Sequence, residues 1–338
     1  MTVPSREQTP TPASYADFGE GSKPRVLRTA VQFFAIPLLI TCVAVAIFVG
    51  AKLLVGGEPT TALEFVELLQ QDTVNRRWQA AMEIAARIRD ATAKNGGVPT
   101  VPDEMRDPRL VKALQDALAR ARADAGDPRS AQWLLLTLSL VGDPDSLPAI
   151  RATLDDANPV VRSFGIVALG RMRDYPSEDR IRDLAEDADA GTRQAAVRTL
   201  ALLEQAPDWK PSEPLVLSST TRALALALLG DRVEDVRFQA AVILGLAGER
   251  EAALPLLKTM LNREALGEIA LDRRAVGIDK YTLQGNLILI AIETVVRLGA
   301  LDDPEVVAAL ERRANDDTEF DRDVRRSARE ALARKRNP

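Results

Sequence analysis

The sequence contains no histidine and a single cysteine, Cys42. Histidine is the commonest general base and the commonest zinc ligand, so its absence removes the usual catalytic and metal-binding chemistry. One cysteine forms no intrachain disulfide and no cysteine cluster for a metal. Carboxylates, lysine, serine and tyrosine remain available for catalysis. The sequence nevertheless favours a noncatalytic protein, and we expect no catalytic residue, no cofactor and no metal site.

Aromatic residues are also scarce, at 4% of the 338 residues, whereas alanine and leucine are plentiful. Both are strong helix formers, which predicts an all-α protein. The formal net charge is −5, so the chain as a whole lacks the positive charge that attracts a polyanion. We therefore expect no nucleic-acid partner, and no motif indicates a small-molecule ligand.

One long apolar stretch, residues 29–51, contains 23 residues without a charge. About 20 apolar residues span the hydrocarbon core as a helix, so this stretch predicts a membrane contact within a transmembrane helix at 27–54. More Lys and Arg residues precede the stretch than follow it closely. The positive-inside rule then predicts a single-pass membrane protein with a cytoplasmic N-terminus and the C-terminal part on the non-cytoplasmic side.

Three alternatives to a spanning helix concern the same stretch. A buried helix of a soluble protein is one, but it fits poorly with a segment that is apolar all round. A cleavable signal peptide has a shorter apolar region, and here the apolar sequence continues past a weak site at 44–46. Lipidation of Cys42 is the third alternative, although Thr41 precedes the cysteine where lipoprotein signals carry a smaller residue. Residues 1–24 are rich in proline, serine, threonine and charge, which predicts a disordered tail.

The rest of the chain repeats a short pattern centred on an arginine. Four segments align on Arg162, Arg193, Arg237 and Arg325. A small residue follows each arginine after three positions and a leucine after seven, which places both on one helix face. The small residues let a neighbouring helix approach closely. A catalytic residue is not expected to recur in this way, so the column predicts a structural role.

A second column supports the first, because an aspartate stands six residues before three of the arginines. These are Asp156, Asp187 and Asp231. We expect each arginine to begin its helix and each aspartate to close the preceding one. Asn158 and Pro159 are a good N-cap and a good first helical residue. We predict that Arg162 joins neighbouring repeats through Asp156, Asp187 or a carbonyl at a helix end.

These columns resemble the HEAT-like repeats of bacterial proteins, including phycobilisome-lyase-related chains, most closely at 142–201 and 231–261. The resemblance implies an α-solenoid over 58–336, in which antiparallel helix pairs stack in a curve and second helices line the concave side. The helix at 281–299 is unusually apolar and is expected to be a buried second helix. We expect about seven pairs, at 60–94, 108–141, 143–172, 177–205, 214–248, 250–299 and 302–335.

Contacts with a partner are expected where loops interrupt the helices. Trp209 lies in a proline-rich loop at 204–219 and is a possible partner contact. The alternative is a loop residue folded onto its own repeats. An insertion at 263–280 departs from the repeat, and its role stays open. The basic stretches at 169–174 and 325–336 are expected to be solvated rather than nucleic-acid sites.

The sequence therefore predicts a membrane-tethered, noncatalytic scaffold or adaptor that uses a HEAT-like solenoid to bind another protein. Two alternatives stay open. One is an enzyme or enzyme accessory on the same repeats, since the resemblance includes lyase-related chains. The other is an assembly factor for a membrane complex. The partner, the binding face and the oligomeric state do not follow from the sequence.

Overall fold

The computed structural model describes residues 61–71, 73–124, 127–206, 210, 213–268, 280–315 and 322–336. The chain divides into two units, Met1–Thr60 and Thr61–Pro338, and every described residue belongs to the second. The tail expected at 1–24 and the transmembrane helix expected at 27–54 lie outside the described residues.

The described residues form α-helices and short 3₁₀ turns without a strand, so the all-α prediction is confirmed for this part of the chain. The helices are α2 (Ala62–Gln70), α3 (Val74–Lys94), α4 (Pro108–Ala123), α5 (Pro128–Val141), α6 (Leu147–Arg151), α7 (Pro159–Arg171), α8 (Glu178–Asp183), α9 (Ala190–Leu203), α10 (Ser219–Leu228), α11 (Glu234–Leu246), α12 (Arg250–Met260), α13 (Arg263–Glu268), α14 (Lys280–Arg297), α15 (Pro304–Asn315) and α16 (Arg322–Arg336). The 3₁₀ turns are η1 (Asp103–Arg106), η2 (Pro144–Ser146), η3 (Ala152–Asp155), η4 (Tyr175–Ser177), η5 (Leu184–Glu186) and η6 (Ala300–Asp302).

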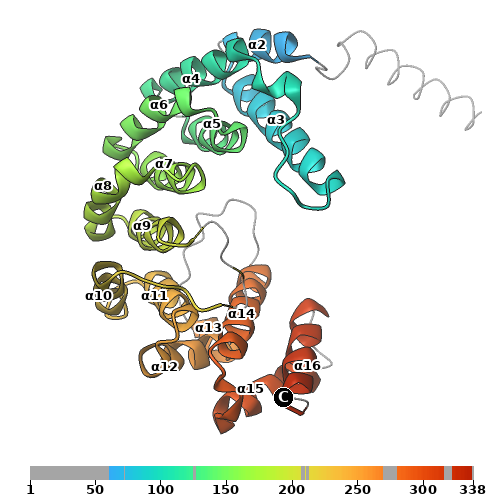
Figure 1. Ribbon diagram of the computed structural model, residues 1–338, viewed down its shortest axis with the longest axis vertical. Helices are drawn as coiled ribbons and strands as arrows, with labels where there is room; N and C mark the ends of the chain where they lie inside the picture. Colours follow the sequence, from blue (N-terminus) through green and yellow to red (C-terminus); the bar gives the residue numbers. More distant parts are fainter. Residues whose placement is uncertain are drawn as a thin grey trace, which may run out of the picture. The chain divides into compact units, whose positions relative to one another are not determined.

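Successive helices pair, and the pairs pack on their neighbours as in an α-solenoid. The second helices contact one another in order, α3 with α5, α5 with α7, α7 with α9 and α9 with α11. The first helices α4, α6, α8 and α10 lie on the other side of this row (Figure 1). A pair of this kind buries its apolar face only against its neighbours, so the array is stabilised one interface at a time.

Local sequence signals explain where the helices begin. Asn158 caps α7 by accepting a hydrogen bond from the backbone N–H of Val160, and Pro159 is its first residue, as predicted. Asp127 caps α5 in the same way through the N–H of Ser130. Because these turns supply side-chain acceptors for otherwise unpaired N–H groups, each second helix starts at a defined residue.

The Leu-Pro pair that recurs in two first helices has two different positions in the structure. Pro148 is in the first turn of α6, where its missing N–H costs nothing. Pro255 instead lies inside α12, which starts five residues earlier at Arg250. The two segments therefore share a sequence pattern, but their helices begin at different points relative to the proline.

Glycines in the second helices mark where neighbouring helices approach most closely. A Cβ atom on Gly165 would lie 2.0 Å from the hydroxyl oxygen of Thr153, and a Cβ on Gly245 would lie 2.5 Å from the methyl of Thr294. These distances are shorter than any non-bonded contact, so glycine is needed for packing at both positions, and Gly165 is the small residue predicted three positions after Arg162.

The helix expected at 281–299 is present as α14, and its inward side is buried as predicted. Ile288, Ala291, Ile292 and Val295 are all at most 3% exposed. They belong to a core that continues into α15 and α16. Glu293 is exposed on the opposite side, so the helix is amphipathic although its sequence is unusually apolar.

The predicted localisation, a single-pass membrane protein, is wrong and is withdrawn. Within the residues that the structure describes, no helix combines the length and the apolar character needed to cross a bilayer. The predicted span at 29–51 is not among those residues. The two longest described helices, α3 and α14, both carry charged residues within their length, which is the physical reason that neither qualifies.

Candidate functional site

The predicted arginine column makes contacts between repeats that follow one geometry. Arg162 donates from Nε and Nη2 to the two carboxylate oxygens of Asp187, at 3.1 and 2.8 Å. Its Nη1 donates to the backbone carbonyls of Asp156 and Ala157, at 2.8 and 3.2 Å. One guanidinium therefore binds the end of its own preceding helix and the carboxylate of the next repeat.

Arg193 repeats this geometry one pair later. It donates to both carboxylate oxygens of Asp231, at 2.8 and 2.7 Å, and to the carbonyls of Asp187 and Ala188, at 2.8 and 3.1 Å. Both side chains are buried, at 7% and 8% exposed. Bidentate pairing of this kind is directional as well as strong.

Each aspartate also accepts a hydrogen bond from a backbone N–H within the turn to which it belongs. Asp187 accepts the N–H of Asp189 at 2.7 Å, and Asp231 accepts the N–H of Val233 at 2.9 Å. Burial by itself raises the pKa of Asp231, but the hydrogen bonds from Arg193 and from Val233 N–H outweigh it, so the pKa lies below its ordinary value. The carboxylate is thus charged at neutral pH and joins a turn to the repeat before it.

Two further pairs extend the series toward the N-terminus. Arg77 donates to Asp127 at 3.1 Å, and Arg122 donates to Asp156 at 2.7 Å. We call the four pairs Arg77–Asp127, Arg122–Asp156, Arg162–Asp187 and Arg193–Asp231 the arginine–aspartate ladder. It joins the turns that precede α5, α7, α9 and α11.

The ladder changes at Arg237. Its Nη1 donates to the carbonyl of Asp231 at 2.9 Å, as in the earlier repeats, but its carboxylate partner is Glu234 of the same helix. The next turn carries Asn262, whose amide oxygen accepts the N–H of Glu264. Arg325, the last member of the predicted column, lies half-buried on α16.

The second helices also share an accessible face. At 100° per residue, positions i, i+4, i+7 and i+11 point in one direction. In α5 these positions hold Arg129, Trp133, Leu136 and Leu140, and in α7 they hold Val160, Phe164, Val167 and Arg171; each is exposed or half-buried, while the positions between them are mostly buried. We call this side of α5, α7, α9 and α11 the second-helix face.

The second-helix face is apolar over α5 and α7, which contact each other. Six half-buried side chains form what we call the apolar patch: Trp133, Leu136, Leu140, Val160, Phe164 and Val167. Clustered apolar side chains at an accessible surface are typical of interaction sites. On α11 the same face carries Asp235 and Gln239 in its first half and Val242 and Leu246 in its second half, so it is less apolar than the face of α5 and α7.

Two arginines lie beside the apolar patch, on adjacent helices. A Cβ on Gly170 would lie 2.6 Å from the methyl of Thr199, so α7 and α9 are in close contact at these two residues, which are the chain neighbours of Arg171 and Arg198. Both arginines are exposed. Desolvation by surrounding atoms and, after it, the positive charge of Arg171 lower the pKa of Arg198. Within the described part of the chain, no carboxylate forms an ion pair with either one.

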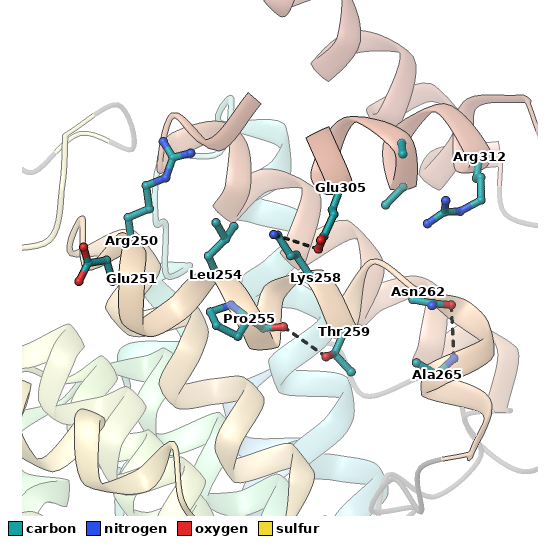
Figure 2. Close-up of a pocket in the computed structure, with 12 residues that line it drawn as sticks. Arg250, Glu251, Leu254, Pro255, Lys258, Thr259, Asn262, Ala265, Glu305 and Arg312 are labelled. Carbon is teal, nitrogen blue, oxygen red and sulfur yellow. Dashed lines mark hydrogen bonds and ion pairs between the residues drawn. The ribbon is translucent and has the colours of Figure 1, made fainter. Parts of the chain in front are cut away.

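A groove of about 880 Å³ lies on the first-helix side, between α12, α13 and α15. Lys258 pairs with Glu305 at 3.0 Å across the groove (Figure 2). It also pairs with Asp303 at 2.8 Å, and Arg250 pairs with Asp302. Hydrogen bonds to Asp303 and Glu305 raise the pKa of Lys258. These cations are neutralised by carboxylates of the next repeat, so the groove joins two repeats through exposed ion pairs.

The remaining predicted contacts fall mostly outside the part of the chain that the structure describes. Trp209 lies outside the described residues, and of the insertion at 263–280 only 263–268 and Lys280 are described. Arg171 belongs to a stretch predicted to be merely solvated, and Arg198 was not predicted at all. A helical-wheel comparison of 159–171 with 190–203 would have placed both on one face, but the packing offset between the helices is visible only in the structure.

Residues 114–201, from α4 to α9, match the family model for HEAT repeats. Over these residues the chain is similar to HEAT repeats. The match covers the ladder pairs Arg122–Asp156 and Arg162–Asp187 together with the apolar patch and both exposed arginines. The predicted HEAT-like repeats are confirmed over this range.

Three solved structures resemble the chain at low identity. The complex of CpcE and CpcF of phycocyanin lyase from Nostoc sp. PCC7120 has 14% identity and a TM-score of 0.47, covering 82% of this chain and 96% of that one. Human deoxyhypusine hydroxylase in complex with glycerol has 16% identity, a TM-score of 0.31 and coverages of 83% and 86%. An engineered protein has 14% identity, a TM-score of 0.36 and coverages of 82% and 96%. No curated protein matches the chain.

Proposed function

We propose that the protein is a noncatalytic scaffold that binds a protein partner on its second-helix face. The observation that carries the proposal is the apolar patch, which spans two consecutive repeats at positions of matching orientation. Trp133, Leu140, Phe164 and Val167 pack in part against the hydrophobic core, and the remaining part of each side chain is accessible on the open side of the helices.

The composition of the apolar patch supports a protein partner. Trp133 and Phe164 are half-buried aromatic side chains that lie among aliphatic ones. Aromatic residues are enriched among the anchors of protein interfaces, because they bury a large area at a small cost in conformational entropy. The scarcity of aromatics in the whole chain, 4%, makes two of them on this face more informative.

The arginine–aspartate ladder supports the same proposal by holding the patch in place. Asp127 and Asp156 fix the turns before α5 and α7, the two helices that carry the patch. A surface that is already ordered loses less conformational entropy when it binds. The arginine–aspartate ladder thus holds neighbouring repeats in register, and the apolar patch remains accessible for contact with a partner.

Site-specific photocrosslinking tests the binding face. A photoreactive phenylalanine analogue replaces Leu136 or Phe164 in the full-length chain, in the cells that normally produce it. The matched control carries the analogue at Asp179, whose side chain is 98% exposed on α8, a first helix of the same region. We expect one common crosslinked protein from Leu136 and Phe164 and none from Asp179.

Two results would contradict the proposal. Crosslinks of equal strength from all three positions would show contact without a preferred face. Crosslinks from Asp179 alone would place the partner on the first-helix side. The noncatalytic part has its own test, a turnover screen of the purified full-length chain, in which a reproducible activity lost on mutation of a second-helix residue would overturn it.

A further inference from the structure

The two exposed arginines on the second-helix face are a pair of like charges that the described structure leaves uncompensated. Arg171 ends α7 and Arg198 lies in the middle of α9, and the close approach of Gly170 to Thr199 brings the two positions together. Two positive charges at short range repel each other, and ion pairs formed by other arginines do not lower this repulsion. The arrangement costs stability unless something outside the described residues compensates it.

The neighbouring basic residues show that this pair is unusual. Arg162 and Arg193, on the same two helices, each bind a carboxylate through two hydrogen bonds. Lys258, on the first-helix side, binds two carboxylates. The positive charges of these three residues are therefore compensated by carboxylates of the same chain. Arg171 and Arg198 differ from them, because both face outward beside the apolar patch.

We propose that Arg171 and Arg198 form a carboxylate-binding site for an acidic segment of a partner protein, whose apolar side chains pack on the adjacent apolar patch. This inference rests on the proposed scaffold function and specifies the chemistry of the partner. An aspartate or glutamate placed between two guanidinium groups accepts charge-assisted hydrogen bonds from both. It also removes the repulsion between them, which adds to the binding free energy.

An acidic protein segment fits this surface better than a nucleic acid does. Nucleic acids bind through many phosphate contacts, whereas the chain has a net charge of −5 and the second-helix face of α5, α7 and α9 carries three arginines, Arg129, Arg171 and Arg198. Phe164 and Val167 share the face of α7 with Arg171, and Leu202 shares the face of α9 with Arg198. A partner segment that alternates acidic and apolar residues can therefore contact the two arginines and the apolar side chains at the same time.

A displayed library of random peptides, selected on the full-length chain, tests the inference. Three chains are compared: the wild type, the double variant Arg171→Glu and Arg198→Glu, and a control with Arg106→Glu and Lys112→Glu. The control changes the net charge equally at two exposed residues of η1 and α4. Far-UV circular dichroism and thermal unfolding check that all three are folded.

We expect peptides enriched in Asp or Glu beside large apolar residues on the wild type and on the control. Synthetic copies of these peptides should bind the Arg171→Glu, Arg198→Glu variant at least about tenfold more weakly, because two charge-assisted contacts are lost. Their affinity for the wild type should fall as salt rises.

The possible failures separate the two proposals. Enriched peptides that lack acidic residues, or that bind the charge-reversed variant equally well, would overturn the carboxylate site and leave the scaffold function standing. A single-stranded oligonucleotide that binds more tightly than the acidic peptides would assign the arginines to nucleic acid and overturn the inference. No enrichment on the wild type would count against the proposed function itself.

Discussion

Replacing Arg193 measures how much the arginine–aspartate ladder contributes to the fold. Arg193→Met keeps the length of the apolar stem and removes four hydrogen bonds, two to the carboxylate of Asp231 and two to backbone carbonyls. Both partners are buried. Breaking a buried ion pair from one side costs about 3–5 kcal/mol, because it leaves an uncompensated charge. Asp231 keeps the N–H of Val233, so we expect about 3 kcal/mol, at the lower end of this range.

The assay combines urea unfolding with hydrogen exchange. Circular dichroism gives the free energy of unfolding, and exchange of backbone amides shows whether the loss is local, since repeat arrays can open in part. Protection should fall mainly in α9, α10 and α11. Arg193→Lys keeps the charge without the planar fork and should lose less than Arg193→Met does. Arg237→Met, which removes a half-buried pair within one helix and one hydrogen bond to the carbonyl of Asp231, should cost about 1 kcal/mol, less than Arg193→Met does.

A double-mutant cycle gives the result that would refute this reasoning. If Arg193 and Asp231 stabilise the fold through each other, Arg193→Met and Asp231→Asn together should cost clearly less than the sum of the single changes, by about 1.5 kcal/mol or more. A cost of Arg193→Met below about 0.5 kcal/mol, or additive single costs, would show that the pair does not act as a link.

The pH dependence of stability gives a second, independent test of the link between Arg193 and Asp231. The pKa of Asp231 is lowered in the folded chain. A lowered carboxyl pKa contributes stability above the unfolded value of about 3.9, and that contribution is lost as the pH falls through the folded value. The stability difference between the wild type and Arg193→Met should therefore be constant from pH 7 to about 5 and shrink below about 4.

Three further predictions concern packing and charge. Gly165→Ala should destabilise the fold by about 1–3 kcal/mol in urea unfolding, because its Cβ would meet the hydroxyl of Thr153. Adding Thr153→Ala should recover part of the loss. A gain in stability from Gly165→Ala alone would contradict the packing. Gly248 has a φ of 85°, so Gly248→Ala should cost about 1–2 kcal/mol, whereas an unchanged melting temperature would argue against this backbone geometry. The pKa of Lys258 is raised by its hydrogen bonds to Asp303 and Glu305. The wild type should therefore melt at a higher temperature than Lys258→Met up to about pH 10, and this difference should vanish as the pH rises through the raised pKa. A difference that stays constant up to about pH 11 would contradict the prediction.

The repeat architecture could be predicted from the sequence because its signals are local and recurrent. Asn158 and Pro159 start a helix through their own chemistry, and the structure places them there. The arginine and aspartate columns were visible because they recur at a fixed offset. What the columns did not show is the division of partners: Arg162 takes the carbonyl of Asp156 and the carboxylate of Asp187.

The first two ladder pairs escaped prediction for a physical reason. Arg122 comes from a first helix, α4, so it does not share the register of Arg162 and Arg193. Asp127 directly precedes its helix rather than standing three residues before it, as Asp156, Asp187 and Asp231 do. The turn aspartate is paired although the sequence offset changes, because a long arginine side chain reaches the same turn from different backbone positions. Arg77 and Arg122 each donate one hydrogen bond to the carboxylate, where Arg162 and Arg193 donate two.

The second-helix face was harder to predict because amphipathic patterns identify the buried side of a helix and leave the other side undetermined. Phe164 and Val167 are apolar in an apolar helix, so nothing in the periodicity of α7 marks them as outward-facing. Arg171 and Arg198 lie 27 positions apart in the chain. Their proximity depends on the offset between α7 and α9, which is set by the contact of Gly170 with Thr199.

The point where the ladder ends separates two kinds of connection between repeats. As far as Asp231, buried or half-buried pairs join each turn to the repeat before it, and such pairs are less affected by salt than exposed ones. Beyond Arg237, the described connection between α12 and α15 includes the pairs Lys258–Glu305 and Arg250–Asp302, whose carboxylates are exposed and more easily screened. The apolar patch and the two outward-facing arginines lie on α5, α7 and α9, within the part joined by the ladder. A surface that must present apolar and charged groups at defined spacing needs a rigid support, and in this chain the arginine–aspartate ladder provides it at those helices.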